Sequence, residues 1–523
     1  MFRKSRLVAT AVVCGAALAL GACGGGGGDD TASSRNGAAG QPVAGGEGRI
    51  LLLGDPRSLD PATLSNQAAI TAPVGNALYG TLMITDEAGK VKYTMAESFA
   101  TTDNGKTFTL KLKPGLVFSD GTPLNAEAVK FNWDRIKDPT VGSSYVVDAR
   151  MIESTEVVDD VTLKATMVNP VPAYAQAVLN SSLNWIASPD ALKAGRDSFD
   201  KNPIGAGPFT LASWTRQADI KFVKNPKYWD APKPYLDRLT MRSATDATQR
   251  LNTVISGGAD VAIDTNTVNI DKAETSDLNA VVTTLNGGNF MAFNSRRAPF
   301  DDIRARQAVS AAIDLDALNL AAYNGTAPMP DTLFDKTSPL FSDTPLHKTD
   351  KALAQKLFDE LAADGKPVKF TFSSFPSSEN RAIAENIQAQ LSAFKNVTVS
   401  VKIVDLGQVA ALRTTFDFDL LVSSASFQDP EPRLWQAFSQ DSVANLSGVK
   451  DKELSDALLA GRTATTEADR KDAYATVQKR LVALSPVVFY QRSTNAAIGT
   501  AKVGGIVQYG SGSLLVEELW IKK

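Results

Sequence analysis

The strongest constraint on the fold is the regular alternation of helix and strand patterns between residues 300 and 427. A helix pattern that begins at Asp301 or Asp302 is followed by ALAQKLFDELAADG (helix), PVKFTFSS (strand), ENRAIAENIQAQLSAF (helix), NVTVSVKIVD (strand), a short helix over 406–413, and DFDLLVSS (strand). Such alternation is typical of a parallel sheet covered by helices, in which ligands bind beyond the carboxyl ends of the strands. We therefore expect 373–375, Asp405 and 423–427 to form one wall of a cleft.

A different pattern precedes this region. Within NGKTFTLKLKPGLVFSDGTPL, the apolar residues Phe108, Leu110 and Leu112 alternate with polar ones, and Pro-Gly and Asp-Gly turns follow. Alternation with period two, bounded by turns, predicts an antiparallel hairpin. Asn125 can cap the next helix, with Glu127 in its first turn. A short apolar run over 50–53 predicts a further strand, so the fold class is α/β.

The N-terminal segment predicts export and a lipid anchor. Arg3, Lys4 and Arg6 precede an apolar run over 7–20, which is typical of a secretory signal and short for a membrane span. LGAC, ending in Cys23, resembles the lipobox of bacterial lipoproteins. We expect a signal peptide at 1–22 and a lipidated Cys23 that begins a flexible Gly-rich tether over 23–47. The alternative is an ordinary cleavable signal with an incidental cysteine.

Composition restricts the classes of function. Residues 1–22 carry three positive charges and no negative ones, so their removal changes the net charge from −3 to −6. This balance argues against nucleic acid as a partner. The two cysteines are Cys14, inside the signal, and Cys23, so the folded body has no thiol for catalysis, metal binding or a disulfide.

Catalytic and cofactor motifs are also missing. The single histidine, His347, lies in the polar stretch FSDTPLHKTD, where we expect a solvated loop. The sequence has no Gly-x-Ser-x-Gly element for a nucleophile, and the glycines of NPIGAGPF lack the Lys-Ser/Thr of a phosphate-binding loop. We therefore assign no catalytic residue, no metal ligand and no cofactor.

Several segments together resemble the family 5 solute-binding proteins, the extracytoplasmic dipeptide, oligopeptide and nickel receptors of ABC importers. These segments are MAESFATTDNGKTFTLKLKPGLVFSDGTPLNAEAVKFNWDRI, NPIGAGPFTLASW, KNPKYWDAPKPYLDRLTMR, LNTVISGGADVAI and FNSRRAPFDDIRARQAVSAAID. The similarity extends from about residue 48 to the C-terminus and rests on the order and spacing of the segments. In this family the shared motifs build the scaffold whereas the cleft varies with the ligand.

The resemblance implies a two-lobed periplasmic-binding-protein fold, type II-like, with an extra subdomain inserted in lobe I. It places lobe I at 48–79, 200–290 and 490–523, the inserted subdomain at 80–199, and lobe II at 291–489. Crossings between lobes are expected near NGGNFMAFN and VVFYQRST. Such proteins close about a hinge around their ligand, and the permease recognises the closed form. A monomer is expected.

Three regions are candidates for ligand contacts. They are Ser65, Asn66 and Gln67 after the first strand, Ser374 and Phe375 at the end of a lobe II strand, and Ser426, Phe427, Asp429 and Trp435 after another. Phe427 and Trp435 can equally be core aromatics. Arg413 could bind a ligand carboxylate, or it is solvated near a helix end.

The segment SASFQDPEPRLW departs from the peptide receptors that the chain resembles. There, an Asp, two variable residues, an acidic residue and Pro follow the corresponding strand, and the first Asp pairs with the α-amine of the peptide. Here that first position holds Ser426, which has no charge to offer an ammonium group. Either Asp429 takes this role, or the ligand has no free amine at that end; we favour the second interpretation.

The expected function is that of a receptor anchored through Cys23 to the outer face of the cytoplasmic membrane. It captures a small ligand, a peptide or peptide-like molecule, and delivers it to an ABC permease. Alternatives within the same fold are an oligosaccharide, an aromatic acid, an opine or a metal chelate, the last weakened because His347 is the only histidine. A lipid-anchored hydrolase is the alternative from another class.

Overall fold

The structure is a computed structural model that describes residues 40–86 and 89–522. The predicted signal peptide, Cys23 and most of the predicted tether lie outside the described residues. The chain is tied to the fold from Gly45, whose N–H donates to the carbonyl of Tyr235 (2.8 Å). Gly46 follows with a bond to Asp237 (3.3 Å). Within the described ranges, no helix combines the length and the hydropathy needed to cross a membrane.

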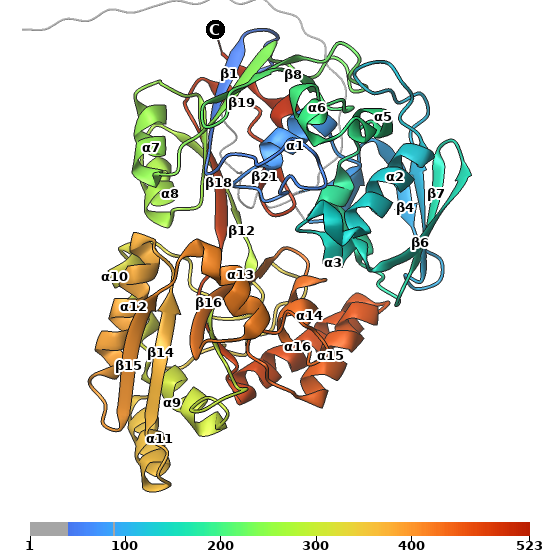
Figure 1. Ribbon diagram of the computed structural model, residues 1–523. Helices are drawn as coiled ribbons and strands as arrows, with labels where there is room; N and C mark the ends of the chain where they lie inside the picture. Colours follow the sequence, from blue (N-terminus) through green and yellow to red (C-terminus); the bar gives the residue numbers. More distant parts are fainter. Residues whose placement is uncertain (1–39, 87–88, 523) are drawn as a thin grey trace, which may run out of the picture. The chain divides into compact units, whose positions relative to one another are not determined.

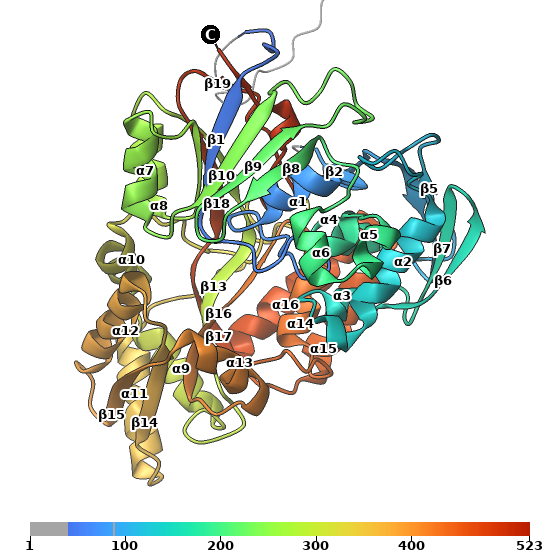
Figure 2. The ribbon, with the colours of Figure 1, turned by 45° about the horizontal axis from the view of Figure 1, so that its top comes forward.

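Lobe I is built on a seven-stranded sheet in the order β12-β18-β11-β1-β10-β9-β8 (Figures 1 and 2). Strand β1 lies near its centre, parallel to both β10 and β11, and its last residues are buried because sheet and helices cover them. The bounds are β1 Glu47–Leu52, β8 Phe209–Trp214, β9 Asp219–Lys224, β10 Arg238–Ser243, β11 Val261–Asp264, β12 Asn279–Thr284, β18 Thr494–Gly499, α1 Ala72–Tyr79, α7 Ala247–Ile255 and α8 Thr267–Glu274.

The chain between β3 and β8 forms a separate four-stranded antiparallel sheet with five helices. Its elements are β4 Ala96–Ala100, β5 Thr107–Leu112, β6 Ile152–Asp159, β7 Thr162–Met167, α2 Ala126–Lys137, α3 Val146–Ala149, α4 Tyr174–Leu179, α5 Pro189–Lys193 and α6 Arg196–Lys201. The predicted alternation is confirmed, since Phe108, Leu110 and Leu112 of β5 are buried. Asn125 caps α2 as predicted, accepting a hydrogen bond from the N–H of Ala128 (3.0 Å).

Lobe II is built on a five-stranded sheet in the order β15-β14-β16-β13-β17. The bounds are β13 Asn286–Phe293, β14 Val368–Ser374, β15 Val397–Ile403, β16 Leu420–Phe427, β17 Val487–Gln491, α9 Ile303–Ala312, α10 Leu315–Tyr323, α11 Lys351–Ala363, α12 Ser378–Leu391, α13 Leu406–Thr415, α14 Arg433–Phe438, α15 Lys452–Thr463 and α16 Glu467–Leu484. The predicted helix–strand alternation is confirmed, and Asp302 is the residue that caps α9.

The three strands of the predicted alternation are parallel, as expected, and β13, which lies outside that alternation, runs in the opposite direction. Strand β14 runs parallel to β15 and β16, but β13 is antiparallel to β16 and β17. The reason is the path of the chain, because β13 enters the sheet from lobe I and β17 returns to it. The antiparallel pair therefore follows from the connection between the lobes, which helix and strand periodicity does not report.

The two crossings lie side by side. The chain passes from β12 to β13 at Leu285, and from β17 to β18 at 492–493. Backbones approach closely here: a Cβ on Gly287 (φ +65°) would lie 2.0 Å from the carbonyl oxygen of Ala425, and one on Gly288 (φ +149°) 2.2 Å from that of Gln491. Glycine at both positions lets β13 fit between its neighbours.

The remaining described elements are short. They are β2 Met83–Thr85 with β3 Val91–Tyr93, β19 Val503–Gly504 with β22 Trp520–Ile521, β20 Gln508–Tyr509 with β21 Ser513–Leu514, and 3₁₀ turns at Pro139–Val141, Ser182–Asn184 and Val516–Glu518. The last two β pairs and α1 close lobe I around its core, so the segment from β19 to β22 packs near β1.

Candidate functional site

A cavity of about 590 Å³, which we call the main cavity, is lined by lobe I, the inserted subdomain and lobe II together. Lobe I contributes the segment 66–70 and residues near the crossings, and the subdomain contributes α3 and α4. Lobe II contributes the end of β16 and the segment that follows it. A cavity walled by all three parts is the usual place for a ligand in a protein with several lobes.

The structure brings five of the predicted ligand residues together in this lining: Asn66, Gln67, Ser426, Phe427 and Asp429. The other four, Ser65, Ser374, Phe375 and Trp435, are outside the lining that the structure describes. Contact with a ligand stays a prediction for all nine.

The two lobe I amides differ in what they can offer. The Asn66 side chain is buried, and its NH₂ donates to the carbonyls of Leu179 (3.2 Å) and Ser181 (2.9 Å), joining lobe I to the inserted subdomain. Gln67 is exposed, and its amide makes no hydrogen bond within the described part of the chain. Gln67 is therefore the one of the pair with hydrogen-bonding capacity left for a ligand.

Three of the four residues outside the lining support the fold. Ser374 is fully buried, and its hydroxyl donates to the carbonyl of Asn380 (2.8 Å) at the start of α12. Phe375 packs against the lobe II core, and the Trp435 ring lies beneath the guanidinium of Arg462, 4.4 Å from the ring centroid. The end of β14 thus fixes the start of α12 through the Ser374 hydrogen bond. The residue of this region that lines the main cavity is Glu379 of α12.

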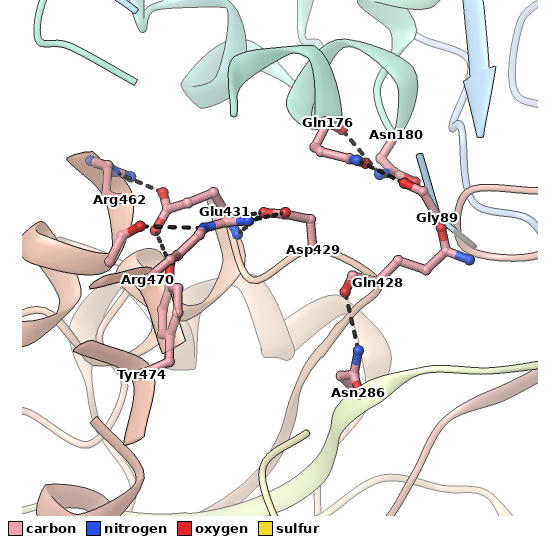
Figure 3. A network of polar contacts seen from close by, with 11 residues as sticks. Gly89, Gln176, Asn180, Asn286, Gln428, Asp429, Glu431, Arg462, Arg470 and Tyr474 are labelled. Carbon is pink, nitrogen blue, oxygen red and sulfur yellow. Dashed lines mark hydrogen bonds and ion pairs between the residues drawn. The ribbon is translucent and has the colours of Figure 1, made fainter. Parts of the chain in front are cut away.

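The segment Asp429–Glu431, which we call the acidic loop, has both of its carboxylates paired (Figure 3). Asp429 accepts two hydrogen bonds from Arg470 of α16, at 2.7 Å each. Burial alone lowers the pKa of Arg470, but the bonds to Asp429 raise it overall. This fork geometry is the strong form of an arginine–carboxylate pair.

Glu431 is paired by the neighbouring helix α15, through a single arginine bond. Its carboxylate accepts from Nε of Arg462 of α15 (2.7 Å) and from the hydroxyl of Tyr474 (3.1 Å). Burial raises the pKa of Glu431, and Arg462 opposes this shift. Both negative charges of the acidic loop are thus bound by the protein itself before any ligand arrives.

Ser426 lies among neutral polar groups at the crossings. Its hydroxyl is 2.6 Å from that of Ser493, which donates in turn to the Asn289 oxygen (3.4 Å). The Asn289 amide donates to Gln491 (2.8 Å). Ser426, which the sequence predicts to stand in place of an anchoring aspartate, is therefore part of an uncharged hydrogen-bonded cluster.

The sequence reasoning missed Asp148, which lines the main cavity from α3. It is buried, and it accepts a hydrogen bond from Gln436 of α14 in lobe II (3.3 Å). Burial raises the pKa of Asp148, and the nearby charge of Arg433 opposes the shift. No local pattern could have found this residue, because its partner is 288 positions away.

Further cavity residues were missed or interpreted differently. Gln176 and Asn180 project from α4 on the side of the network opposite the acidic loop (Figure 3). Glu379 accepts from the hydroxyl of Tyr323 (2.7 Å), and burial raises the pKa of Glu379. Arg413, for which we considered both a ligand carboxylate and a solvated helix end, is exposed and lines the main cavity, and burial by surrounding protein lowers its pKa.

The prediction that His347 is a solvated loop residue is wrong. It is half-buried rather than solvated, and its Nε2 donates to the carbonyl of Ile313 (2.9 Å). Burial lowers its pKa. In the described ranges, no cluster of three or more His, Cys, Asp and Glu side chains is arranged to hold a metal ion.

Comparison with known proteins decides the family. The model of the bacterial extracellular solute-binding proteins, family 5, middle region, matches residues 90–445. The chain belongs to this family. A curated relative from Pectobacterium atrosepticum, named glutathione-binding protein GsiB, is 31% identical over 381 residues, 71% of this chain and 72% of the relative.

Solved structures agree on the fold. AgaA from A. tumefaciens R10, in complex with agropinic acid, has a TM-score of 0.77 at 24% identity and covers 91% of this chain and 99% of its own. DppA from Helicobacter pylori, in complex with the peptide STSA, has a TM-score of 0.76 at 23% identity over 92% and 99%. NikA from Brucella suis, in complex with Fe(III)-EDTA, has a TM-score of 0.77 at 21% identity and covers 91% of this chain and 100% of its own.

Membership of this family defines the class of function. The protein is an extracellular solute-binding protein of family 5, a binding protein rather than an enzyme. The expected two-lobed α/β fold is confirmed.

Proposed function

We propose that this family 5 receptor captures a small peptide-like solute that has no free α-amine at the acidic loop, and that it does so while anchored to the membrane through Cys23. The observation that carries the choice of ligand is the pairing of Asp429 with Arg470 and of Glu431 with Arg462. A free ammonium group placed there would meet no carboxylate whose charge is available.

The energetic argument concerns the cost of freeing a carboxylate. Removing one partner from a buried ion pair destabilises a protein by about 3–5 kcal/mol, because the other charge stays buried. A ligand ammonium that bound Asp429 in place of Arg470 would leave the partly buried Arg470 guanidinium without its counter-charge. A neutral ligand end against Ser426 avoids this cost, since hydroxyl and amide groups exchange hydrogen bonds without moving a charge.

The rest of the main cavity supports a ligand rich in amide or hydroxyl groups. Gln67, Gln176, Asn180 and Asn495 line it with side chains that both donate and accept hydrogen bonds. Glutathione, the ligand in the name of the curated relative, is a tripeptide. A peptide-like solute with a blocked or displaced amine satisfies both the amide-rich lining and the neutral position at Ser426.

The test of the ligand class is titration calorimetry with free and N-acetylated di- to pentapeptides, and with neutral oligosaccharides. Wild type is compared with Asp429→Asn and Ser426→Asp. We expect acetylated peptides to bind wild type at least as tightly as free ones, and Ser426→Asp to shift the preference toward free peptides. Tight binding of free peptides that is lost both on acetylation and in Asp429→Asn would contradict the proposal, and binding of oligosaccharides alone would replace the peptide-like ligand.

The lipid anchor has a separate test. Cys23→Ser should move the protein from the membrane fraction to the soluble extracytoplasmic fraction, because acyl chains contribute about 0.8 kcal/mol per buried CH₂. The thermal melting of the released body should equal that of wild type. Membrane association that persists in the serine variant would refute the anchor and leave the ligand proposal intact.

A further inference from the structure

A second cavity of about 200 Å³ adjoins the main cavity in lobe II, and we call it the side cavity. The two cavities share Arg413 of α13, Ser424 of β16 and Arg433 of α14. These three residues lie where one cavity meets the other. A group bound there would be within reach of a ligand in the main cavity.

Both charged side chains at this junction are positive. Arg413 and Arg433 alone carry charge among the side-cavity residues that the structure describes. No ion pair or hydrogen bond joins either guanidinium to a described residue, although Arg462 and Arg470 nearby are both paired. Burial lowers the pKa of Arg413 and no carboxylate opposes this, while the charge of Arg433 acts on Asp148 only at longer range.

Acids elsewhere in the main cavity do not cancel this charge. Asp429 and Glu431 are bound by their own arginines, and Glu379 accepts a hydrogen bond from Tyr323. Asp148 is directed to Gln436. The junction therefore keeps two cations that form no ion pair with a described residue.

Part of the side-cavity lining is apolar, beside the polar side chains of Gln436 and Ser447. Phe290, Phe438, Leu446 and Val487 line it, and the rings of Phe290 and Phe438 lie 5.7 Å apart. Ser423 and Ser424 also line it, and their hydroxyls make no side-chain hydrogen bond with any described residue. Two arginines and two hydroxyls in the same lining as apolar side chains match a carboxylate that has an apolar group beside it.

We propose that the side cavity is a subsite for a carboxylate with a neighbouring apolar group, such as the last residue of a peptide-like ligand that ends in a hydrophobic side chain. The carboxylate lies between the guanidiniums of Arg413 and Arg433, and the apolar group packs against Phe290 and Phe438. Arginine suits this role because its planar fork matches a carboxylate and its charge-assisted bonds are strong. The proposal deepens the proposed function and rests on the main cavity being the solute site.

The test is calorimetry on the purified full chain with three probes: N-acetyl-L-phenylalanine, its uncharged amide, and N-acetylglycine. We expect N-acetyl-L-phenylalanine to bind wild type at least tenfold more tightly than either of the others. Arg413→Gln and Arg433→Gln should each weaken its binding at least tenfold and leave the binding of the amide unchanged. Thermal melting of each variant confirms that it is folded.

Two controls separate charge from shape. Arg381→Gln removes an exposed arginine of α12 that lies outside the lining of both cavities, and it should change nothing. Ala444→Trp fills the side cavity from an exposed position, so it should weaken N-acetyl-L-phenylalanine but not N-acetylglycine.

Equal binding of the acid and its amide, no binding of the acid at millimolar concentration, or an equal effect of Arg381→Gln would overturn the subsite. If acetylated peptides still bound with the preferences described above, and were insensitive to both arginine variants, the proposed function would stand and this inference alone would fail.

Discussion

The acidic loop and the arginines of the side cavity both line the main cavity, yet only the arginines offer a ligand an unpaired charge. Asp429 and Glu431 are each bound by an arginine from α15 or α16. Arg413 and Arg433 have no such partner in the described part of the chain. A paired charge projects little field beyond its partner, whereas an unpaired one remains available. The charge that a ligand meets therefore depends on which residues the fold has already paired, more than on which residue types line the cavity.

The largest expected effect breaks a pair of the acidic loop. Arg462→Ala should lower the free energy of unfolding by about 3–5 kcal/mol, because it leaves the buried Glu431 carboxylate without its counter-charge. Urea denaturation measures the change. In Arg462→Ala with Glu431→Gln no charge is left behind, so most of the stability should return. A loss below about 1 kcal/mol, as for a surface pair, would show that the acidic loop is not held in this way.

An effect of intermediate size on stability is expected for a buried acid that is not paired with an arginine. Glu517 in lobe I is buried, its Oε2 has no hydrogen-bond partner in the described structure, and burial raises its pKa to about 7 from 4.5. The folded state therefore keeps a proton that the unfolded chain releases between these values, so stability is fully present below pH 4.5 and is lost as the pH rises to about 7.

The variant Glu517→Gln should remove this loss. At about pH 8 we expect it to be more stable than wild type by about 1–3 kcal/mol, and at about pH 4 the two should be nearly equal. Urea denaturation across this range checks the sign. A difference that does not depend on pH would mean that Glu517 keeps the same proton affinity on folding, and would weaken the contrast with the paired Glu431.

The smallest expected effect concerns the side cavity. Arg413→Gln and Arg433→Gln should change the free energy of unfolding by no more than about 0.5 kcal/mol, since neither guanidinium loses an ion pair or hydrogen bond. The same urea measurements provide the comparison with Arg462→Ala. If either substitution cost as much as that variant, its guanidinium would belong to the fold, and the contrast between the two regions would disappear.

Predictions from the sequence succeeded where the cause is local. The cap at Asn125, the alternation along β5 and the helices and strands of lobe II depend on residues within a few positions of each other. They missed features that a distant segment decides. The strand order of lobe II depends on a chain that leaves for lobe I and returns, and Ser374 serves α12 because that helix packs against it.

The sequence by itself determined the architecture and the class of receptor, because hydrophobic periodicity, caps and the spacing of scaffold motifs act over short distances or recur along the whole chain. It also located the acidic loop and the replacement at Ser426. Only the tertiary structure decided what these residues can do. Asp429 meets Arg470 41 positions away, Asp148 meets Gln436 across 288, and Arg413 forms no ion pair with any acid in the part of the chain that the structure describes. Charge pairing is a property of the folded chain, since the energy of a buried carboxylate depends on the atom beside it rather than on its neighbours in sequence.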